Sequence, residues 1–198
     1  MDLWEIENSL FAEGYNIIAG VDEAGRGSLA GPVCAAAVIL PRGLEIPGLN
    51  DSKKLTAKKR DALYDVIVRS AVSYGIAFAS EKEIDDVNIL NATYLAMNRA
   101  IEKLAAAPDI SIIDGNRSQG INYKNITVVG GDGKSASVAA ASVLAKVTRD
   151  RLMDEMDARY PQYQFSKHKG YPTKLHYEML RQYGPSPIHR MTFLKKMH

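Results

Sequence analysis

The segment IIAGVDEAGRGSLAGPVCAAAVIL, residues 17–40, predicts two buried strands joined by a glycine-rich loop. Residues 17–21 and 33–40 contain only apolar side chains and glycine, which is typical of buried strands. The first strand stops at two adjacent acids, Asp22 and Glu23. Because successive side chains on a strand point to opposite faces, neighbouring acids can serve one site only where the strand ends or bends. We therefore expect a bend here, with a candidate site beside it.

The loop after these acids carries groups that suit a phosphate. Gly25 and Gly27 allow the bend and let backbone N–H groups approach a ligand closely, and Arg26 carries a forked donor. Acids beside such a loop repel one another unless a cation lies between them. The segment therefore predicts a cation-dependent site.

Composition indicates a globular protein. The 198 residues are 46% hydrophobic and 24% charged, enough for one sizeable core with room for a small appended subdomain. The apolar runs fall short of the ~20 residues of a membrane-spanning helix, and the acidic, amphipathic N-terminus is unlike a signal peptide. We expect a cytoplasmic protein without a membrane span. The single cysteine, Cys34, lies in an apolar strand, where packing is its expected role.

The charge is distributed unevenly along the chain. Residues 1–140 hold 14 Lys/Arg against 18 Asp/Glu, whereas residues 141–198 hold 11 against 5. The basic end is also rich in aromatic residues from Tyr160 onward. This mixture suits a polyanion with surfaces for stacking, but it also suits a solvated basic face packed on its own aromatic rings. Composition leaves both interpretations open.

Helices and strands alternate after residue 40. Residues 55–75 predict a helix, followed by a third strand over 75–80. Apolar residues near one face of that helix are Leu63, Val66, Ile67 and Val72. A second amphipathic helix is indicated by steps of three and four residues between Leu90, Tyr94, Met97, Ile101 and Leu104.

Two further short strands are predicted at 109–115 and 125–132, each ending in an aspartate beside glycine. Ser135 or Ser137 then caps a long helix that runs to about Arg159. This order predicts an α/β fold in which helices flank a mixed β-sheet. We expect a catalytic domain over 1–159 and a small C-terminal helical segment over 160–198, with a helix at about 174–183.

Three predicted strand ends carry acids: Asp22 with Glu23, Asp114, and Asp132. Ligands of open α/β sheets sit beyond the carboxyl ends of strands, so these acids can converge. Four carboxylates in one site require metal, and hard oxygen ligands favour Mg²⁺ or Mn²⁺. Each aspartate could instead only shape a turn beside glycine, but three strands ending alike favour the metal site. Two such ions suit attack of water on a phosphodiester.

Two other patterns do not predict a functional site. The stretch GGDGKS, residues 130–135, is not a nucleotide-binding P-loop, because that pattern requires glycine where Val128 stands. The four histidines lack paired metal-ligand spacing, so each is expected on the surface, in a polar network or at a phosphate. They are His168, His176, His189 and His198.

An ordered set of motifs resembles a known family. These are VDEAGRG, LNDSKKL, IIDGN, GGD, AAASVLAKVTRDR, YPQYQF, HKGYPT and PIHR, and they span nearly all of residues 17–193. Their order and spacing are similar to those of the type 2 ribonucleases H, the ribonuclease HII family. The resemblance implies the ribonuclease H fold and an endonuclease that cuts the RNA strand of RNA–DNA hybrids. It further implies incision of duplex DNA at single ribonucleotides, leaving 3′-hydroxyl and 5′-phosphate ends.

The resemblance also implies residue roles. Asp22, Glu23, Asp114 and Asp132 take the four catalytic, metal-binding positions. Asp22 would bridge two ions, with Asp132 on the side of the attacking water and the other two acids on the leaving-group side.

Further positions match the substrate contacts of the family. The backbone of Gly25, Arg26 and Gly27 would contact the 2′-hydroxyl at the RNA–DNA junction, and Tyr171 would stack on the following deoxyribose. Positions expected near the nucleic-acid backbone are Lys53, Lys54, Ser142, Lys146 and Arg149, although Ser142 could equally serve helix packing. The chain departs from the family at Ser28, where proline is frequent, and at Gln164, where glycine is common.

We expect a monomer that acts on hybrid and ribonucleotide-containing duplexes. A recombinase-like or Holliday-junction nuclease with the same metal chemistry would instead cut branched DNA. A hybrid-binding module would bind without turnover.

Overall fold

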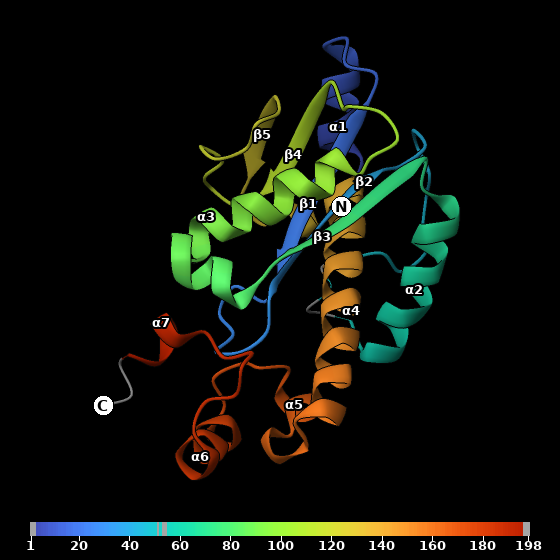
Figure 1. Ribbon diagram of the computed structural model, residues 1–198. Coiled ribbons are helices and arrows are strands. Elements are labelled where there is room, and N and C mark those ends of the chain that lie inside the picture. Colours follow the sequence, from blue (N-terminus) through green and yellow to red (C-terminus); the bar gives the residue numbers. More distant parts are fainter. Residues whose placement is uncertain (1–2, 51, 53–54, 196–198) are drawn as a thin grey trace.

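The computed structural model describes residues 3–50, 52 and 55–195 (Figure 1). The strands are β1 (Ile18–Ala24), β2 (Val33–Ile39), β3 (Ser73–Ala79), β4 (Ile110–Asp114) and β5 (Asn125–Val128). The longer helices are α1 (Glu5–Ala12), α2 (Ala57–Ser70), α3 (Glu81–Glu102), α4 (Ala136–Arg159) and α6 (Lys174–Tyr183). The short helical elements are η2 (Gly131–Gly133), η3 (Pro161–Tyr163), α5 (Phe165–His168) and α7 (Met191–Leu194). None of the described helices combines the length and apolar character needed to cross a membrane.

The strands form one mixed sheet in the order β3-β2-β1-β4-β5. The β1–β2 and β2–β3 pairs are antiparallel, whereas the β1–β4 and β4–β5 pairs are parallel. The carboxyl ends of β1, β4 and β5 therefore meet at one edge of the sheet. This arrangement confirms the predicted mixed sheet and brings the acid-bearing segments together.

Helices cover both faces of the sheet (Figure 1). In β2, Cys34, Ala36 and Val38 face a core shared with α2 and α4, while the alternate residues face the core under α3. Small side chains on both faces let the helices approach closely. At Gly20 of β1 the approach is extreme, since a Cβ atom would lie 2.1 Å from the carbonyl carbon of Ser137 in α4.

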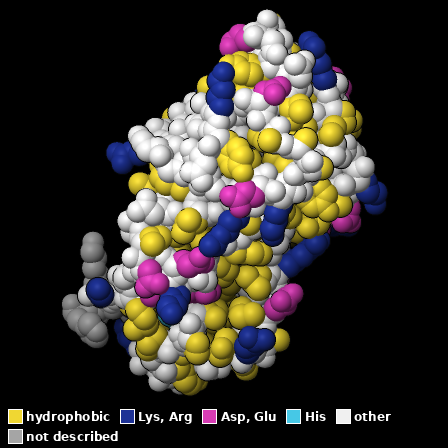
Figure 2. Space-filling view, turned by 45° about the horizontal axis from the view of Figure 1, so that its top comes forward, with side chains coloured by type: hydrophobic (Ala, Val, Ile, Leu, Met, Phe, Trp, Pro, Cys, Tyr) yellow, Lys and Arg dark blue, Asp and Glu magenta, His cyan; other side chains and the backbone are white. Residues whose placement is uncertain are grey.

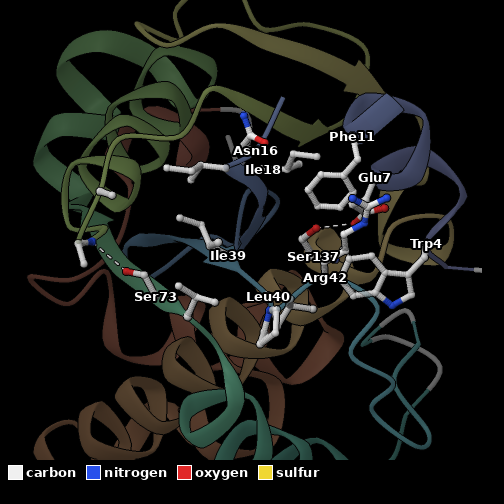
Figure 3. Close-up of a pocket in the computed structure, with 15 residues that line it drawn as sticks. Trp4, Glu7, Phe11, Asn16, Ile18, Ile39, Leu40, Arg42, Ser73 and Ser137 are labelled. Atoms are coloured by element: carbon white, nitrogen blue, oxygen red, sulfur yellow. Dashed lines mark hydrogen bonds between the residues drawn. The ribbon is translucent and has the colours of Figure 1, made fainter. Parts of the chain in front are cut away.

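Two sets of hydrogen bonds stabilise the start of α4. Ser135 is the N-cap, and its hydroxyl accepts the N–H of Val138 at 3.2 Å. The buried carboxylate of Glu7 in α1 accepts the Ser137 N–H at 3.0 Å and the hydroxyls of both serines, beside a pocket between α1 and the end of β2 (Figure 3). A carboxylate at this end also complements the helix dipole. Of the two predicted caps, Ser135 is the one observed.

Two predicted helices have different bounds. The predicted 55–75 helix ends at Ser70, and β3 begins at Ser73, because Val72 N–H and the following residues pair with β2. Val72, expected on the buried face, is 66% exposed. The second helix, α3, contains a break at Asn88, where φ is 68° and the side chain accepts the N–H groups of Leu90 and Asn91. Asn88 thus caps a second helical stretch.

The described part of the C-terminal segment packs below one end of α4 (Figure 1). Tyr163 and Phe165 stack with ring centroids 5.3 Å apart, in a small core that includes Ala30 and Met153. Both rings are buried. Their burial agrees with the second interpretation of the composition, in which a solvated basic face packs on its own aromatic rings. On the face shown in Figure 2, Lys/Arg and Asp/Glu side chains are intermixed. The division at residue 159 stays a prediction, since both parts contribute to this core.

Candidate active site

Three aspartates converge at the carboxyl edge of the sheet. Asp22 lies in β1, Asp114 ends β4, and Asp132 lies in η2, and one carboxylate oxygen of each is within 4.8 Å of the others. Convergence was predicted, but two local predictions were wrong. The strand β1 continues through both acids to Ala24, and Asp132 lies in a 3₁₀ turn beyond the end of β5 rather than at the strand end.

Backbone hydrogen bonds orient two of the three aspartates, Asp114 and Asp22. The N–H of Gly131 donates to Asp114 Oδ1 at 2.7 Å, which ties the end of β4 to the turn that carries Asp132. The N–H of Glu23 donates to Asp22 Oδ1, also at 2.7 Å. The carboxylates are therefore oriented by backbone that belongs to the site itself.

The electrostatics of the site favour a bound cation. Burial raises the pKa of Asp22 well above its usual value, and the neighbouring carboxylates of Glu23 and Asp114 raise it further. Hydrogen bonds from the Ser142 hydroxyl and the Glu23 N–H oppose this rise without cancelling it. Clustered carboxylate oxygens with excess negative charge are the donors that Mg²⁺ and Mn²⁺ prefer. The aspartates thus fit a hard divalent ion.

Glu23, the fourth predicted acid, lies beside this cluster and is not one of its three members. On β1 it follows Asp22 directly, so its side chain leaves the opposite face of the strand. Its Oε1 pairs with Arg26 Nη1 at 3.2 Å. Glu23 nevertheless lines two cavities that Asp114 also lines.

The acids open into a cavity of about 210 Å³ that unites sequence-distant residues. It is lined by Asp22, Glu23, Ala24, Gly25, Arg26, Gly27, Ser52, Asp114, Ser142, Lys146 and Tyr171. A neighbouring cavity of about 270 Å³ shares Glu23, Arg26 and Asp114 and adds Asn116 and Arg117. The sequence analysis did not single out Ser52, which stands within the motif LNDSKKL, or Arg117, which directly follows the motif IIDGN.

The loop at residues 25–27 is shaped by two buried arginines. Gly25 has a φ of +93°, and a Cβ atom there would lie 1.9 Å from Arg149 Nε. Arg190 donates to the carbonyls of Gly25 at 2.7 Å and Arg26 at 2.9 Å. In the described part of the chain the N–H groups of Arg26 and Gly27 donate to no protein acceptor. The loop therefore turns carbonyls inward and leaves donors for a ligand.

Arg149, predicted near the nucleic-acid backbone, has a different position. Its guanidinium is fully buried and donates to the carbonyls of Pro32, Lys169 and Ala30 at 2.9–3.0 Å. A phosphate cannot reach a side chain enclosed in this way. Direct contact is therefore excluded, because the carbonyl-rich loops around Arg149 require its donors internally.

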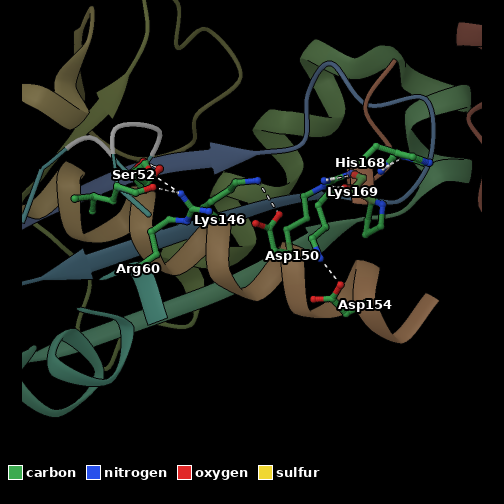
Figure 4. Close-up of polar contacts among 12 residues, drawn as sticks. Ser52, Arg60, Lys146, Asp150, Asp154, His168 and Lys169 are labelled. Atoms are coloured by element: carbon green, nitrogen blue, oxygen red, sulfur yellow. Dashed lines mark hydrogen bonds and ion pairs between the residues drawn. The ribbon is translucent and has the colours of Figure 1, made fainter. Parts of the chain in front are cut away.

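The other predicted backbone contacts differ in accessibility. Ser142 is buried, with its Oγ 2.8 Å from Ser52 Oγ, so it packs within α4 while also lining the cavity. Arg60 donates to the Ser52 carbonyl at 3.0 Å, and Lys146 Nζ pairs with Asp150 at 2.7 Å (Figure 4). Lys53 and Lys54 lie outside the described residues.

Tyr171 stands at the rim of the cavity. Its ring lies 5.5 Å from Lys146 Nζ and 5.4 Å from Arg149 Cζ, within the range of cation–π attraction. Gln164, which stands where the family commonly has glycine, adopts a φ of +55°, a conformation that glycine takes without strain.

Comparison with known proteins agrees with this geometry. A model of the family "Ribonuclease HII" matches residues 19–196. The chain is 52% identical to the ribonuclease HII of Caldicellulosiruptor bescii over 98% of this chain and 94% of that protein. It is 54% identical to the ribonuclease HII of Acetivibrio thermocellus over 96% of this chain and 74% of that protein. The crystal structure of the ribonuclease H2 from Pyrococcus horikoshii superposes with a TM-score of 0.73 at 29% identity, covering 89% and 93% of the two chains.

Proposed function

The chain belongs to the ribonuclease HII family of metal-dependent nucleases that act on RNA–DNA hybrids, and on that premise we propose that it also incises duplex DNA 5′ to single ribonucleotides. The products would carry 3′-hydroxyl and 5′-phosphate ends. One observation carries the proposal: Asp22 and Asp114 of the aspartate cluster, the loop at 25–27 and Tyr171 line a single cavity. Cleavage chemistry and recognition of a junction can therefore act on one phosphodiester.

The acids would hold two Mg²⁺ or Mn²⁺ ions. Asp22 would bind both, Asp132 would bind on the side of the attacking water, and Glu23 and Asp114 would bind on the leaving-group side. The ions would supply an activated water and neutralise charge on the departing oxygen. The protein contributes orientation, since the Gly131 and Glu23 N–H groups already fix Asp114 and Asp22.

The loop at 25–27 would recognise the 2′-hydroxyl that distinguishes RNA from DNA. Because Arg190 occupies the carbonyls of Gly25 and Arg26, recognition would depend on N–H groups that donate to the 2′-oxygen. Tyr171 would pack on the next sugar, where a second 2′-hydroxyl would weaken the contact. Together they would select a ribonucleotide followed by a deoxyribonucleotide.

Other residues would hold the duplex. Lys146, Lys53 and Lys54 would contact phosphates, and affinity would fall steeply with salt. Arg149 would act from beneath the loop rather than at a phosphate. We further propose that the protein acts as a monomer.

A cleavage assay tests the proposal. The protein is incubated with Mg²⁺ or Mn²⁺ and an end-labelled duplex that contains one ribonucleotide, beside an all-DNA duplex, a branched DNA junction and a uniform hybrid. We expect a nick 5′ to the ribonucleotide with a ligatable 3′-hydroxyl, and no cutting of the two DNA controls. Cleavage of the uniform hybrid alone would refute incision at single ribonucleotides.

A further inference from the structure

Three histidines from the C-terminal segment form a buried cluster that the cleavage chemistry does not use. His168, His176 and His189 are 6%, 0% and 3% exposed. The rings of His168 and His176 stack at 4.2 Å, and His176 Nε2 lies 3.0 Å from His189 Nε2. Two neutral imidazoles can share such a bond only if one nitrogen carries hydrogen and the other does not. The cluster must therefore have a defined proton order.

Backbone groups determine that order. The Ser186 N–H donates to His189 Nδ1 at 2.8 Å, so in the neutral ring the proton is on Nε2. His189 Nε2–H then donates to His176 Nε2, which leaves the His176 proton on Nδ1. His176 Nδ1 is 3.0 Å from the carbonyl oxygen of Tyr171, to which it donates. The chain of donors thus runs from Ser186 to Tyr171.

Burial keeps this arrangement neutral. It lowers the pKa of His176 and of His189 to about 4, far below the ordinary histidine value. A proton added to His176 would place hydrogens on both facing Nε2 atoms and break the bond between the rings. A proton added to His189 would instead go to Nδ1, where it would oppose the Ser186 N–H.

The backbone on both sides of Tyr171 is held by the same region. Tyr171 N–H donates to the His168 carbonyl at 2.8 Å, and Gly170 N–H donates to His168 Nδ1 at 3.2 Å. The Gly170 carbonyl accepts the Leu29 N–H at 2.8 Å, which joins this turn to the loop that follows residues 25–27. The position of Tyr171 over the cavity is thereby tied to the histidine cluster.

We propose that His176 and His189 are positioning residues for junction recognition, forming a proton-ordered relay that fixes the backbone of Tyr171 over the substrate cavity. The proposal rests on the proposed function, because it takes Tyr171 as the residue that packs on the deoxyribose. The relay touches neither substrate nor ions, so it acts on selection between substrates rather than on cleavage itself.

Paired substitutions test the relay. His176→Leu removes the donor to the Tyr171 carbonyl, whereas His176→Asn places an amide N–H near the Nδ1 position. We expect His176→Leu to lower the ratio of single-ribonucleotide cleavage to uniform-hybrid cleavage by about tenfold, the size of one lost buried hydrogen bond. His176→Asn should retain most of the ratio. Tyr171→Ala sets the lower limit, and Leu63→Ala in α2 is the control for lost stability alone.

Nitrogen-15 NMR gives an independent readout. Wild-type His176 should show the Nδ1–H tautomer and His189 the Nε2–H tautomer, and the carbonyl carbon shift of Tyr171 should change in His176→Leu and return in His176→Asn. An unchanged cleavage ratio in His176→Leu, with both activities falling in step as in Leu63→Ala, would overturn the proposal. So would the opposite tautomers. If the wild-type protein cuts only uniform hybrid, the proposed function fails, and the tautomers and the Tyr171 shift still decide whether the relay exists.

Discussion

Two groups of charged side chains lie near the cavity, and their partners differ. In the acidic centre, carboxylates of Asp22, Asp114 and Asp132 approach one another, and the pKa of Asp22 is raised. In the arginine scaffold, Arg149 and Arg190 each donate to three backbone carbonyls and lie fully buried. Burial lowers the pKa of both guanidiniums, that of Arg190 to about 9.

This difference in partners indicates that the acidic centre binds a ligand and that the arginine scaffold supports the neighbouring loops. A cation that is fully buried and donates to three carbonyls is out of reach of a ligand, and it stabilises the loops that supply those carbonyls. Buried acids that repel one another gain from a ligand of opposite charge. We infer that the acidic centre exists for an ion and that the scaffold exists for the loop at 25–27. The following predictions test that division, beginning with the largest effect.

Asp114→Asn should reduce cleavage by about a thousandfold with little loss of stability. The amide oxygen can still accept the Gly131 N–H, so the turn is kept while a charged ligand is lost. Binding of a hybrid should be equal or tighter, because repulsion of phosphate falls. Single-turnover rates and binding titrations measure this, with Asp109→Asn before the start of β4 as the matched control. Retained cleavage would show that Asp114 is not needed to bind the metal ion.

Arg190→Lys should instead act on stability, lowering the free energy of unfolding by about 3 kcal/mol. Lysine keeps the charge but cannot reach the carbonyls of Gly25, Arg26 and Gly31 together, and buried carbonyls without donors are costly. Urea unfolding measures the loss. Arg181→Lys on the exposed side of α6 should change stability by less than about 0.5 kcal/mol. An equally small loss of stability in both variants would show that a positive charge at position 190 is sufficient for the arginine scaffold.

Acidification should weaken the histidine cluster and leave both arginines charged. The folded pKa of His176 and of His189, about 4, is below the unfolded value of 6.5, so the unfolded chain binds more protons between these values. Stability is therefore greatest above pH 6.5 and falls as pH decreases toward 4. The pair should contribute a loss of about 2 kcal/mol between pH 7 and 5.5.

The titratable groups that face this pair are His168 and Tyr163, and Asp157 acts on His168. Urea unfolding of wild type and His176→Asn across this pH range isolates the contribution, because the variant should show a shallower slope. A steeper slope in the variant would contradict the assignment.

Lys146→Gln should have the smallest effect. Lys146 lines the cavity, so its loss should weaken binding of all duplexes alike and reduce the dependence of log affinity on log salt by about one. Lys124→Gln, near the opposite edge of the sheet, is the matched control and should leave the slope unchanged. A reduced slope in both variants would mean that the cavity does not define the path of the duplex.

The elements that periodicity and caps define were predictable, and the placement of charge was not. The strand at β4 and the helix at α4 follow from local pattern, as does convergence of Asp22 with Asp114 once the parallel sheet is assumed. Arg149 shows what sequence pattern cannot predict. A charged residue on a helix is expected to be exposed, and only the fold reveals that carbonyls from distant loops surround this one. The helical pattern up to Val72 was likewise misleading, because the chain there pairs with β2 and leads into β3. The histidine cluster depends on contacts among α5, α6 and the segment at His189, which spacing does not encode.

Helix α4 connects the two groups directly. It begins just after the turn of Asp132, passes Ser142 beside the acids and reaches Arg149 beneath the loop, held at its start by Glu7. Ser142 and Arg149 are seven positions apart, which is about 10 Å along a helix that rises 1.5 Å per residue. Under the proposed function, the helix would therefore set the distance between the phosphate that is cut and the sugar that the loop and Tyr171 contact. One residue inserted between these positions would turn its two ends out of phase by about 100° and disconnect inspection from cutting.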